Sequence, residues 1–256
     1  MEAVYESDER AHLTPYTESE IKFRAVLLTA AEIFTAVTML WLIGRGDYGH
    51  FGICIETFAL VLSPLTVEKV FRCKGSSAMF ALVLFYALGP IFGHCYKLHY
   101  LTSWWDKMHH FIGGGIFVFF GLFLFRRMAQ ARSIAGAALF AFCFSIMISS
   151  VWEIAEYGGD VLFGWDTQND TYVSEINSYL LGDEPGEKVT ISTVVEVEIN
   201  GRKLPESGYL DIGLNDTMLD LIAGAAGALV AALFLMIDRG RHAAIYSRKR
   251  EETGPA

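Results

Sequence analysis

Acidic and histidine side chains recur at helical spacing at the ends of three apolar segments. One segment opens with Asp106 and His110, and a later one opens with Asp216 and Asp220, each pair four residues apart. Side chains four residues apart lie on one face of a helix. Between these two segments, a third one closes with acids three and four residues apart: Glu153, Glu156 and Asp160. All of them fall within about two helical turns, roughly 10 Å, of the same predicted end of the segments.

Several carboxylates and an imidazole in a poorly hydrated place indicate a cation site. Ionised carboxylates repel one another there unless a cation neutralises them or some of them stay protonated. Carboxylate and imidazole ligands suit Zn²⁺, Mn²⁺ or Mg²⁺, and such an ion can activate water for hydrolysis. The residues divide by expected role into metal ligands and catalytic groups: the ligands are Asp106, His110, Asp216 and Asp220, and the catalytic residues are Glu153 and Glu156.

Simpler interpretations stay open for some of these residues. Acids at the start of a helix are favoured by its macrodipole, so Asp106 and Asp216 could be N-caps. The dipole does not explain Glu153 and Glu156, because they stand near a predicted helix C-terminus, where it opposes negative charge. Three further histidines on the same side are typical of polar residues at a membrane interface: His50, His94 and His99.

The segments that carry these residues are long enough to cross a membrane. About 20 apolar residues span the hydrocarbon core of a bilayer, and 53% of the chain is hydrophobic. The third run contains Pro90, which should kink it near its far end. Six runs are predicted, at about 25–43, 50–66, 77–96, 107–125, 133–157 and 216–237. The fold class expected is an all-α membrane protein, a six-transmembrane-helix bundle with a small extracytoplasmic β-hairpin insert.

The distribution of charge predicts the orientation of the bundle. Lys and Arg gather after the second, fourth and sixth runs and, as Lys22 and Arg24, before the first. By the positive-inside rule these ends face the cytoplasm. The tryptophans map to the opposite interface, where indoles favour the headgroup zone: Trp41, Trp104, Trp105, Trp152 and Trp165. We expect a multi-pass protein of the prokaryotic cytoplasmic membrane with both termini cytoplasmic. The acidic start lacks the positive region of a cleavable signal peptide, so the first run should remain as an anchor.

These patterns divide the chain into consecutive regions. The predicted regions are a cytoplasmic tail (1–20), transmembrane helices one to five (21–163), an extracytoplasmic insert (164–215), helix six (216–238) and a basic cytoplasmic tail (239–256).

The insert contains a hairpin signal. Asn200-Gly201 supplies the pair of positive-φ residues that a tight β-turn needs, and Val189–Ile199 before it partly alternates between apolar and polar residues. Lys203–Ile212 is expected to return as the partner strand.

The motifs together resemble the YjdF-like family of bacterial and archaeal inner-membrane proteins, over helices three to six. They are Trp105-Asp106-Lys107-x-x-His110-Phe111, Trp152-Glu153-x-x-Glu156-Tyr157, Asp166-Thr167-Gln168 and Asp216-Thr217-x-x-Asp220. That family has no established activity, so the resemblance implies a topology and a set of positions. The chain is more distantly similar to VanZ-like membrane proteins, some of which are associated with glycopeptide resistance. It departs from them because no Arg closely follows Glu156 and because Asp220 stands where Asn is common.

Three functions remain open. The first is a metal-dependent hydrolase that acts on a lipid or cell-envelope precursor at the outer face of the membrane. The second is an ion-coupled transporter with a polar path through Glu32 and Glu56, although the chain shows no internal repeat of the kind that transporters often have. The third is a non-catalytic envelope assembly or interaction factor whose insert binds a partner. Nucleic-acid binding is not expected, because the net charge is −9 and no basic surface is evident.

Overall fold

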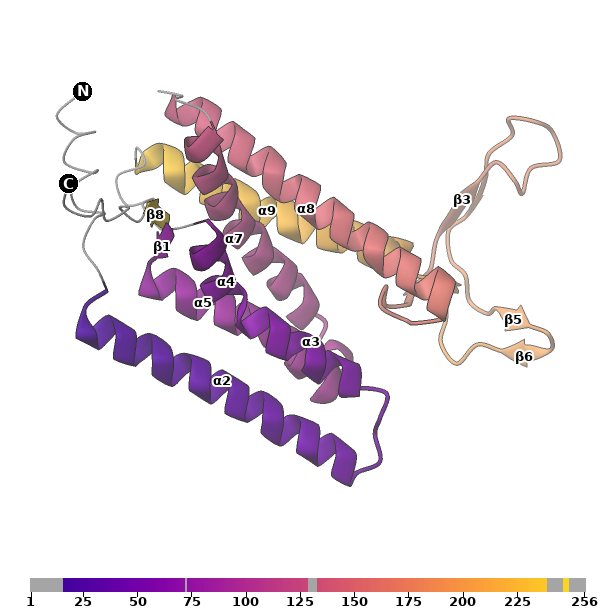
Figure 1. Cartoon of the computed structure of the whole chain (residues 1–256). Helices are drawn as coiled ribbons and strands as arrows, with labels where there is room; N and C mark the ends of the chain where they lie inside the picture. Colours follow the sequence, from indigo (N-terminus) through magenta and orange to yellow (C-terminus); the bar gives the residue numbers. More distant parts are fainter. Residues whose placement is uncertain (1–15, 72, 129–132, 239–245, 249–256) are drawn as a thin grey trace, which may run out of the picture. The chain divides into compact units, whose positions relative to one another are not determined.

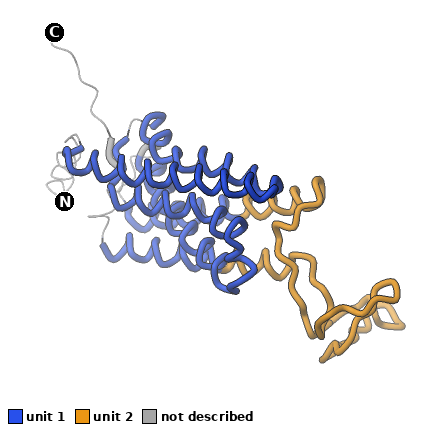
Figure 2. Tube along the Cα trace, turned by 90° about the horizontal axis from the view of Figure 1, so that it is seen from below, with its two compact units in different colours: residues 1–149, 223–256 blue, residues 150–222 orange. Residues whose placement is uncertain are grey.

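The computed structural model of the protein describes residues 16–71, 73–128, 133–238 and 246–248. It forms two compact units, residues 1–149 with 223–256 (unit 1) and residues 150–222 (unit 2), shown in Figure 2. Most of the predicted N-terminal tail and most of the basic C-terminal tail lie outside the described residues. Two long helices, α8 (Ile134–Phe163) and α9 (Leu214–Ile237), each contribute residues to both units.

The described part of the chain contains six helical segments that are long and apolar enough to cross a membrane, which confirms the predicted fold class. They are Glu18–Gly44, Phe51–Val70, Ser77–Cys95, Trp105–Arg126, Ile134–Phe163 and Leu214–Ile237. Several of the helices extend beyond the predicted apolar runs because polar residues continue them. In α2 (Glu18–Gly44), for example, Thr17 accepts a hydrogen bond from the backbone N–H of Glu20, and the Glu20 carboxylate accepts one from the backbone N–H of Thr17. This reciprocal capping box fixes the start of α2 seven residues before its predicted apolar run.

Prolines divide the second and third spans. The second consists of α3 (Phe51–Val61) and α4 (Ser63–Val70), with Pro64 in the first turn of α4. In the third, α5 (Ser77–Ala87) is followed by Pro90 and a π-helix, η1 (Ile91–Cys95), so the break expected at Pro90 is present. A short strand between these spans, β1 (Cys73–Gly75), pairs antiparallel with β8 (Tyr246–Arg248). In Figure 1, α2, α3 and α5 lie side by side and form one part of unit 1.

Close helix contacts through glycine hold α7 (Trp105–Met128) to the unit 1 parts of α8 and α9. A Cβ atom on Gly114 would lie 2.0 Å from the carbonyl oxygen of Gly224, and one on Gly227 would lie 1.9 Å from that of Phe111. Ser145 donates a 2.8 Å hydrogen bond to the carbonyl oxygen of Gly114. Small residues permit such approach in membranes, where packing rather than the hydrophobic effect drives association. The core next to these contacts contains Val118, Leu122, Ala137, Ala141, Ala228, Ala231, Ala232 and Leu235.

Unit 2 carries short antiparallel strand pairs between α8 and α9. The pairs are β2 (Thr171–Val173) with β7 (Tyr209–Asp211), β3 (Ile176–Ser178) with β4 (Val189–Ile191), and β5 (Glu198–Ile199) with β6 (Arg202–Lys203).

The hairpin prediction is right at its turn and wrong in its strands. Asn200 and Gly201 have φ values of 50° and 79°, and they connect β5 to β6 as expected. However, Val189–Ile199 and Lys203–Ile212 do not pair along their length: β4 pairs with β3, and β7 pairs with β2. Beyond β6, the backbone N–H of Leu204 donates one more hydrogen bond to the carbonyl oxygen of Val197, at 2.9 Å.

Candidate metal centre

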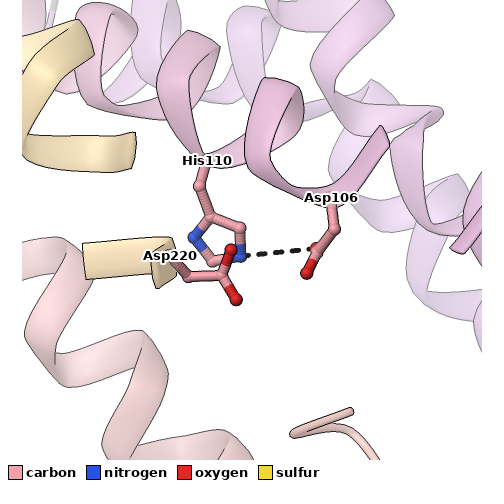
Figure 3. A group of neighbouring side chains, drawn as sticks. All are labelled: Asp106, His110 and Asp220. Atoms are coloured by element: carbon pink, nitrogen blue, oxygen red, sulfur yellow. Dashed lines mark ion pairs between the residues drawn. The ribbon is translucent and has the colours of Figure 1, made fainter. Parts of the chain in front are cut away.

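The first turns of α7 place an acid and an imidazole together. Asp106 and His110 are half-buried, and the Asp106 Oδ1 atom lies 3.6 Å from the His110 Nε2 atom (Figure 3). The other carboxylate oxygen of Asp106 is 3.2 Å from the Lys107 ammonium group. An acid in the first turn of a helix is also favoured by the macrodipole. The predicted pair on one face of this helix is therefore present, and it is held by neighbouring charges.

The broken third span brings another histidine to the same carboxylate. His99 lies on α6 (Leu98–Leu101), a single turn between η1 and α7, and its Nδ1 atom is 3.5 Å from the Asp106 Oδ1 atom. The ring of His94, on η1, lies with its centroid 4.6 Å from that of His99. The sequence alone favours an interfacial role for both histidines. The contact of His99 with Asp106 had no sequence signal, because a turn between two helices removes any periodic relation between them.

His50, the third histidine of that group, contacts a different acid. Its Nδ1 atom is 2.9 Å from the carboxylate of Asp47, in the loop between α2 and α3. The hydrogen bond from the His50 side chain lowers the pKa of Asp47. His50 thus connects the start of α3 to Asp47 of this loop.

On α8 the predicted acids lie within the last three turns, and the helix continues beyond them. The helix continues to Phe163, past the predicted end at residue 157, and within it Glu153 is buried and Glu156 is half-buried. Asp160 accepts hydrogen bonds from the backbone N–H and the hydroxyl of Thr167, at 2.8 and 2.6 Å, and from the backbone N–H of Gln168 at 3.0 Å. Asp160 therefore anchors the turn that follows α8, whereas Glu153 and Glu156 lie earlier along the helix.

On α9 the two predicted acids are both buried and have different surroundings. Asp216 accepts hydrogen bonds from the backbone and the side-chain amide of Asn169, at 2.9 and 3.2 Å. Next to it, the Gln168 side chain donates to the Thr217 hydroxyl. Asp220 is only 2% exposed and lies one helical turn before Gly224. Asp216 thus holds Asn169, the residue that follows the Asp166-Thr167-Gln168 motif.

Five of the six predicted site residues belong to groups that could hold a metal ion. The groups are Asp106, His110 and Asp220, and His110, Glu153 and Glu156. His110 belongs to both. Among the described residues, neither group includes Asp216. The donor set consists of carboxylate oxygens and one imidazole, which suits Zn²⁺, Mn²⁺ or Mg²⁺.

The sequence matches a family model described as a predicted membrane protein family (DUF2238), over residues 26–241. This match covers most of the chain and all six candidate spans except the start of the first, so the protein belongs to that family. It is a multi-pass membrane protein. No curated protein and no solved structure matches the chain.

Proposed function

We propose that this protein is a metal-dependent membrane hydrolase that acts on a lipid or cell-envelope substrate at the outer face of the membrane. One observation carries the proposal: carboxylates and one imidazole make up two groups of potential metal ligands, and His110 belongs to both groups. Acids at membrane depth are costly and usually serve a function.

The register between α7 and α9 supports a shared site. In unit 1, a Cβ atom on Gly224 would lie 3.7 Å from the carbonyl oxygen of His110, and Gly114 lies against the backbone of Gly224 and Ala228. The two helices therefore run parallel here. Asp106 and Asp220 each come four residues earlier than His110 and Gly224, about 6 Å along their helices. We infer from this register that Asp220 faces the Asp106–His110 turn of α7.

The same reasoning applies to α8. Ser145 bonds to the Gly114 carbonyl, and the hydroxyl of Ser149 would lie 3.1 Å from a Cβ atom on Gly224. Glu153 follows Ser149 by four residues, so it continues the face that meets α7 and α9. The acids lie near the C-terminal end of α8 and near the N-terminal end of α9. We therefore infer that Glu153 and Asp220 both come to the level of His110. The buried state of Glu153 and Asp220 supports this placement.

Such a site can hydrolyse an ester. Asp106, His110 and Asp220 would hold the ion, and a bound ion would supply Lewis-acid chemistry that polarises the substrate oxygen and activates a water. Glu153 or Glu156 would accept the proton of that water as its oxygen attacks the carbonyl or phosphoryl centre. The bond to the leaving alcohol then breaks, and the alcohol takes up the proton. A site at the end of membrane-spanning helices favours a substrate that enters from the lipid phase.

The orientation that puts this site outside is part of the proposal. It is supported by the Lys and Arg clusters at the other ends of the spans and by the tryptophans near the site. The more distant likeness of the motifs to VanZ-like proteins, some of which are associated with glycopeptide resistance, supports a substrate from the cell envelope. A transporter with a path through Glu32 and Glu56 has less support, since Glu56 is exposed on α3.

Elemental analysis of the detergent-purified protein tests the proposal. After supplementation with Zn²⁺, Mn²⁺ or Mg²⁺ and gel filtration, we expect about one ion per chain in the wild type and a loss of that ion in Asp220→Asn. Asp47→Asn is the matched control, because Asp47 is an acid outside both ligand groups, and it should retain the ion. A wild-type protein that neither retains nor titrates with any of the three ions would overturn the proposed function.

A further inference from the structure

Two imidazole rings lie directly on glycines of the third span. A Cβ atom on Gly89 would lie 2.0 Å from the Nε2 atom of His109, and one on Gly93 would lie 2.0 Å from the Nε2 atom of His99. The glycines are four residues apart and flank Pro90. Each ring therefore occupies the space that a side chain would take, and neither arrangement is possible with a larger residue.

The two rings reach different partners. His109 stacks on Tyr86, with ring centroids 4.1 Å apart, and its Nε2 atom is 2.7 Å from the Tyr86 carbonyl oxygen. That ring is tied to the backbone of α5. His99 instead turns its Nδ1 atom to the carboxylate of Asp106, at 3.5 Å, with its side chain 10% exposed. Only the second ring contacts an acid of the candidate metal centre.

The irregular backbone of residues 90–101 aims His99 at α7. In η1 the backbone N–H of Tyr96 bonds to the carbonyl oxygen of Ile91 at 3.1 Å, the wide turn of a π-helix. Lys97 then adopts φ 64°, which turns the chain into the single turn of α6 that carries His99. Single π-turns inside helices occur frequently at functional sites. A regular helix through this segment would carry His99 away from Gly93.

We infer that His99 is a positioning residue that orients the Asp106 carboxylate for metal binding. Gly93 leaves the space in which the His99 ring packs. The inference rests on the proposed function. A carboxylate on a flexible side chain loses rotational freedom when it binds an ion, and a fixed imidazole beside it reduces that loss. Partners that orient a metal-binding side chain typically change metal affinity by about 10–100-fold when they are removed.

Zn²⁺ affinity, measured by competition with a chelating dye on the full-length protein in detergent, tests this inference. We expect His99→Leu to bind Zn²⁺ about 10–100-fold more weakly than the wild type. His99→Asn should rescue most of the affinity, because its amide nitrogen can occupy the position of Nδ1. Gly93→Ala should weaken binding similarly to His99→Leu, since its methyl group displaces the ring while the imidazole itself is kept.

His109→Leu and Gly89→Ala are the matched controls, because they disturb the other ring on the same segment. They should leave Zn²⁺ affinity within about threefold of the wild type, well below the 10-fold limit for an orienting partner. The visible absorption spectrum of bound Co²⁺ adds a readout of ligand geometry, and it should change in Gly93→Ala but not in Gly89→Ala.

The outcomes separate the two proposals. A wild-type protein that binds neither Zn²⁺ nor Co²⁺ overturns the proposed function itself. Metal binding in the wild type with unchanged affinity in His99→Leu and Gly93→Ala overturns only the role of His99. Equal losses in the His99 and His109 variants would also overturn it, since they would show a general effect of packing.

Discussion

The two ends of unit 1 both bury charged side chains, and they satisfy them in different ways. Where α2 begins and α4 ends, Arg24 and Glu68 form an ion pair of 2.6 Å with both side chains less than 10% exposed. The same Glu68 oxygen accepts hydrogen bonds from the Tyr16 hydroxyl and the backbone N–H of Gly75, at 2.7 and 2.9 Å. Arg24 also lies over the rings of Tyr16 and Phe80, 4.2 Å from each centroid.

At that end, each buried charge is compensated by a partner. Burial and the hydrogen bond to Glu68 raise the pKa of Tyr16, so its hydroxyl stays protonated and remains a donor. A cavity of about 260 Å³ beside the pair is lined mainly by apolar residues of α2, α4 and α5. Each charge has an opposite charge or a donor, and this arrangement joins three helices. Its function is structural.

At the other end the balance is different. One carboxylate, Asp106, contacts two imidazoles and a lysine. It also belongs, with His110 and Asp220, to a group of potential metal ligands. Burial of a charge is costly unless it is paired. The ion pair at the first end indicates a structural role, whereas under the proposed function the acids of the metal-ligand groups would bind a cation. Substitutions at the two ends should therefore differ in their effects on stability and on metal binding.

Removal of the Arg24 guanidinium group, at the end that carries the ion pair, should have the largest effect on stability. Arg24→Leu leaves Glu68 buried without its partner, and we expect a loss of about 3–5 kcal/mol in the free energy of unfolding. Unfolding of the detergent-solubilised protein by added SDS would measure it. The double variant Arg24→Met/Glu68→Leu should recover most of the loss, because it removes both charges. A loss below about 1 kcal/mol in Arg24→Leu, as for an exposed pair, would contradict the structural role.

At the site end, stability should depend on metal. A ligand that binds only the folded state stabilises it by about 2.7 kcal/mol at 100 times its dissociation constant. We expect this gain for the wild type with added Zn²⁺ and none for Asp220→Asn, measured by the same SDS unfolding. Without metal, Asp220→Asn should be as stable as the wild type or more so, because it removes a buried charge. A metal-free variant several kcal/mol less stable than the wild type would make Asp220 structural, like Glu68.

The helix contacts beneath the site should be less costly to disturb. Gly114→Ala places a methyl group 2.0 Å from the backbone oxygen of Gly224, so α7 and α9 must separate. We expect a loss of about 1–3 kcal/mol, together with weaker metal binding. Gly52→Ala on α3 is the control, because a methyl group there meets no atom within 4 Å. It should be neutral, or stabilising by about 0.5–1 kcal/mol through helix propensity. Equal effects of the two variants would argue against the close contact.

The smallest expected effect is in the loop between α2 and α3. The hydrogen bond from His50 lowers the pKa of Asp47, so ionised Asp47 stabilises the folded state above the unfolded pKa of about 4. The stabilisation is lost as the pH falls through the lowered folded pKa. Asp47→Asn should therefore lower the unfolding midpoint slightly at pH 7 and not at pH 3. A difference that is the same at both pH values would remove this explanation.

Much of the fold follows from the sequence because hydropathy and local geometry are local properties. The six apolar runs, the break at Pro90 and the Asn200-Gly201 turn each depend on neighbouring residues alone. Helix ends were less accurate, since capping by residues such as Thr17 lies outside the apolar run. The strand partners of β4 and β7 were wrong because pairing depends on segments distant in sequence.

The buried charges show the same limit. Arg24 was interpreted only as a flanking charge that orients the first span, yet its partner Glu68 lies 44 residues away. The i, i+4 pair of Asp106 and His110 could be predicted from helical spacing, and the structure places the two together. His99 could not, because its approach depends on a π-helix and a positive φ at Lys97. Local patterns thus predict which residues share a face, and tertiary structure decides which faces meet.

A double-mutant cycle on metal affinity tests the central claim, that His110 of α7 and Asp220 of α9 bind one ion. Zn²⁺ affinity would be measured for the wild type, His110→Ala, Asp220→Asn and the double variant. If both residues bind the same ion, either single substitution removes most of the affinity, and the double variant binds no more weakly than the weaker single one. Losses that add in full, or a wild-type affinity in either single variant, would contradict a shared site.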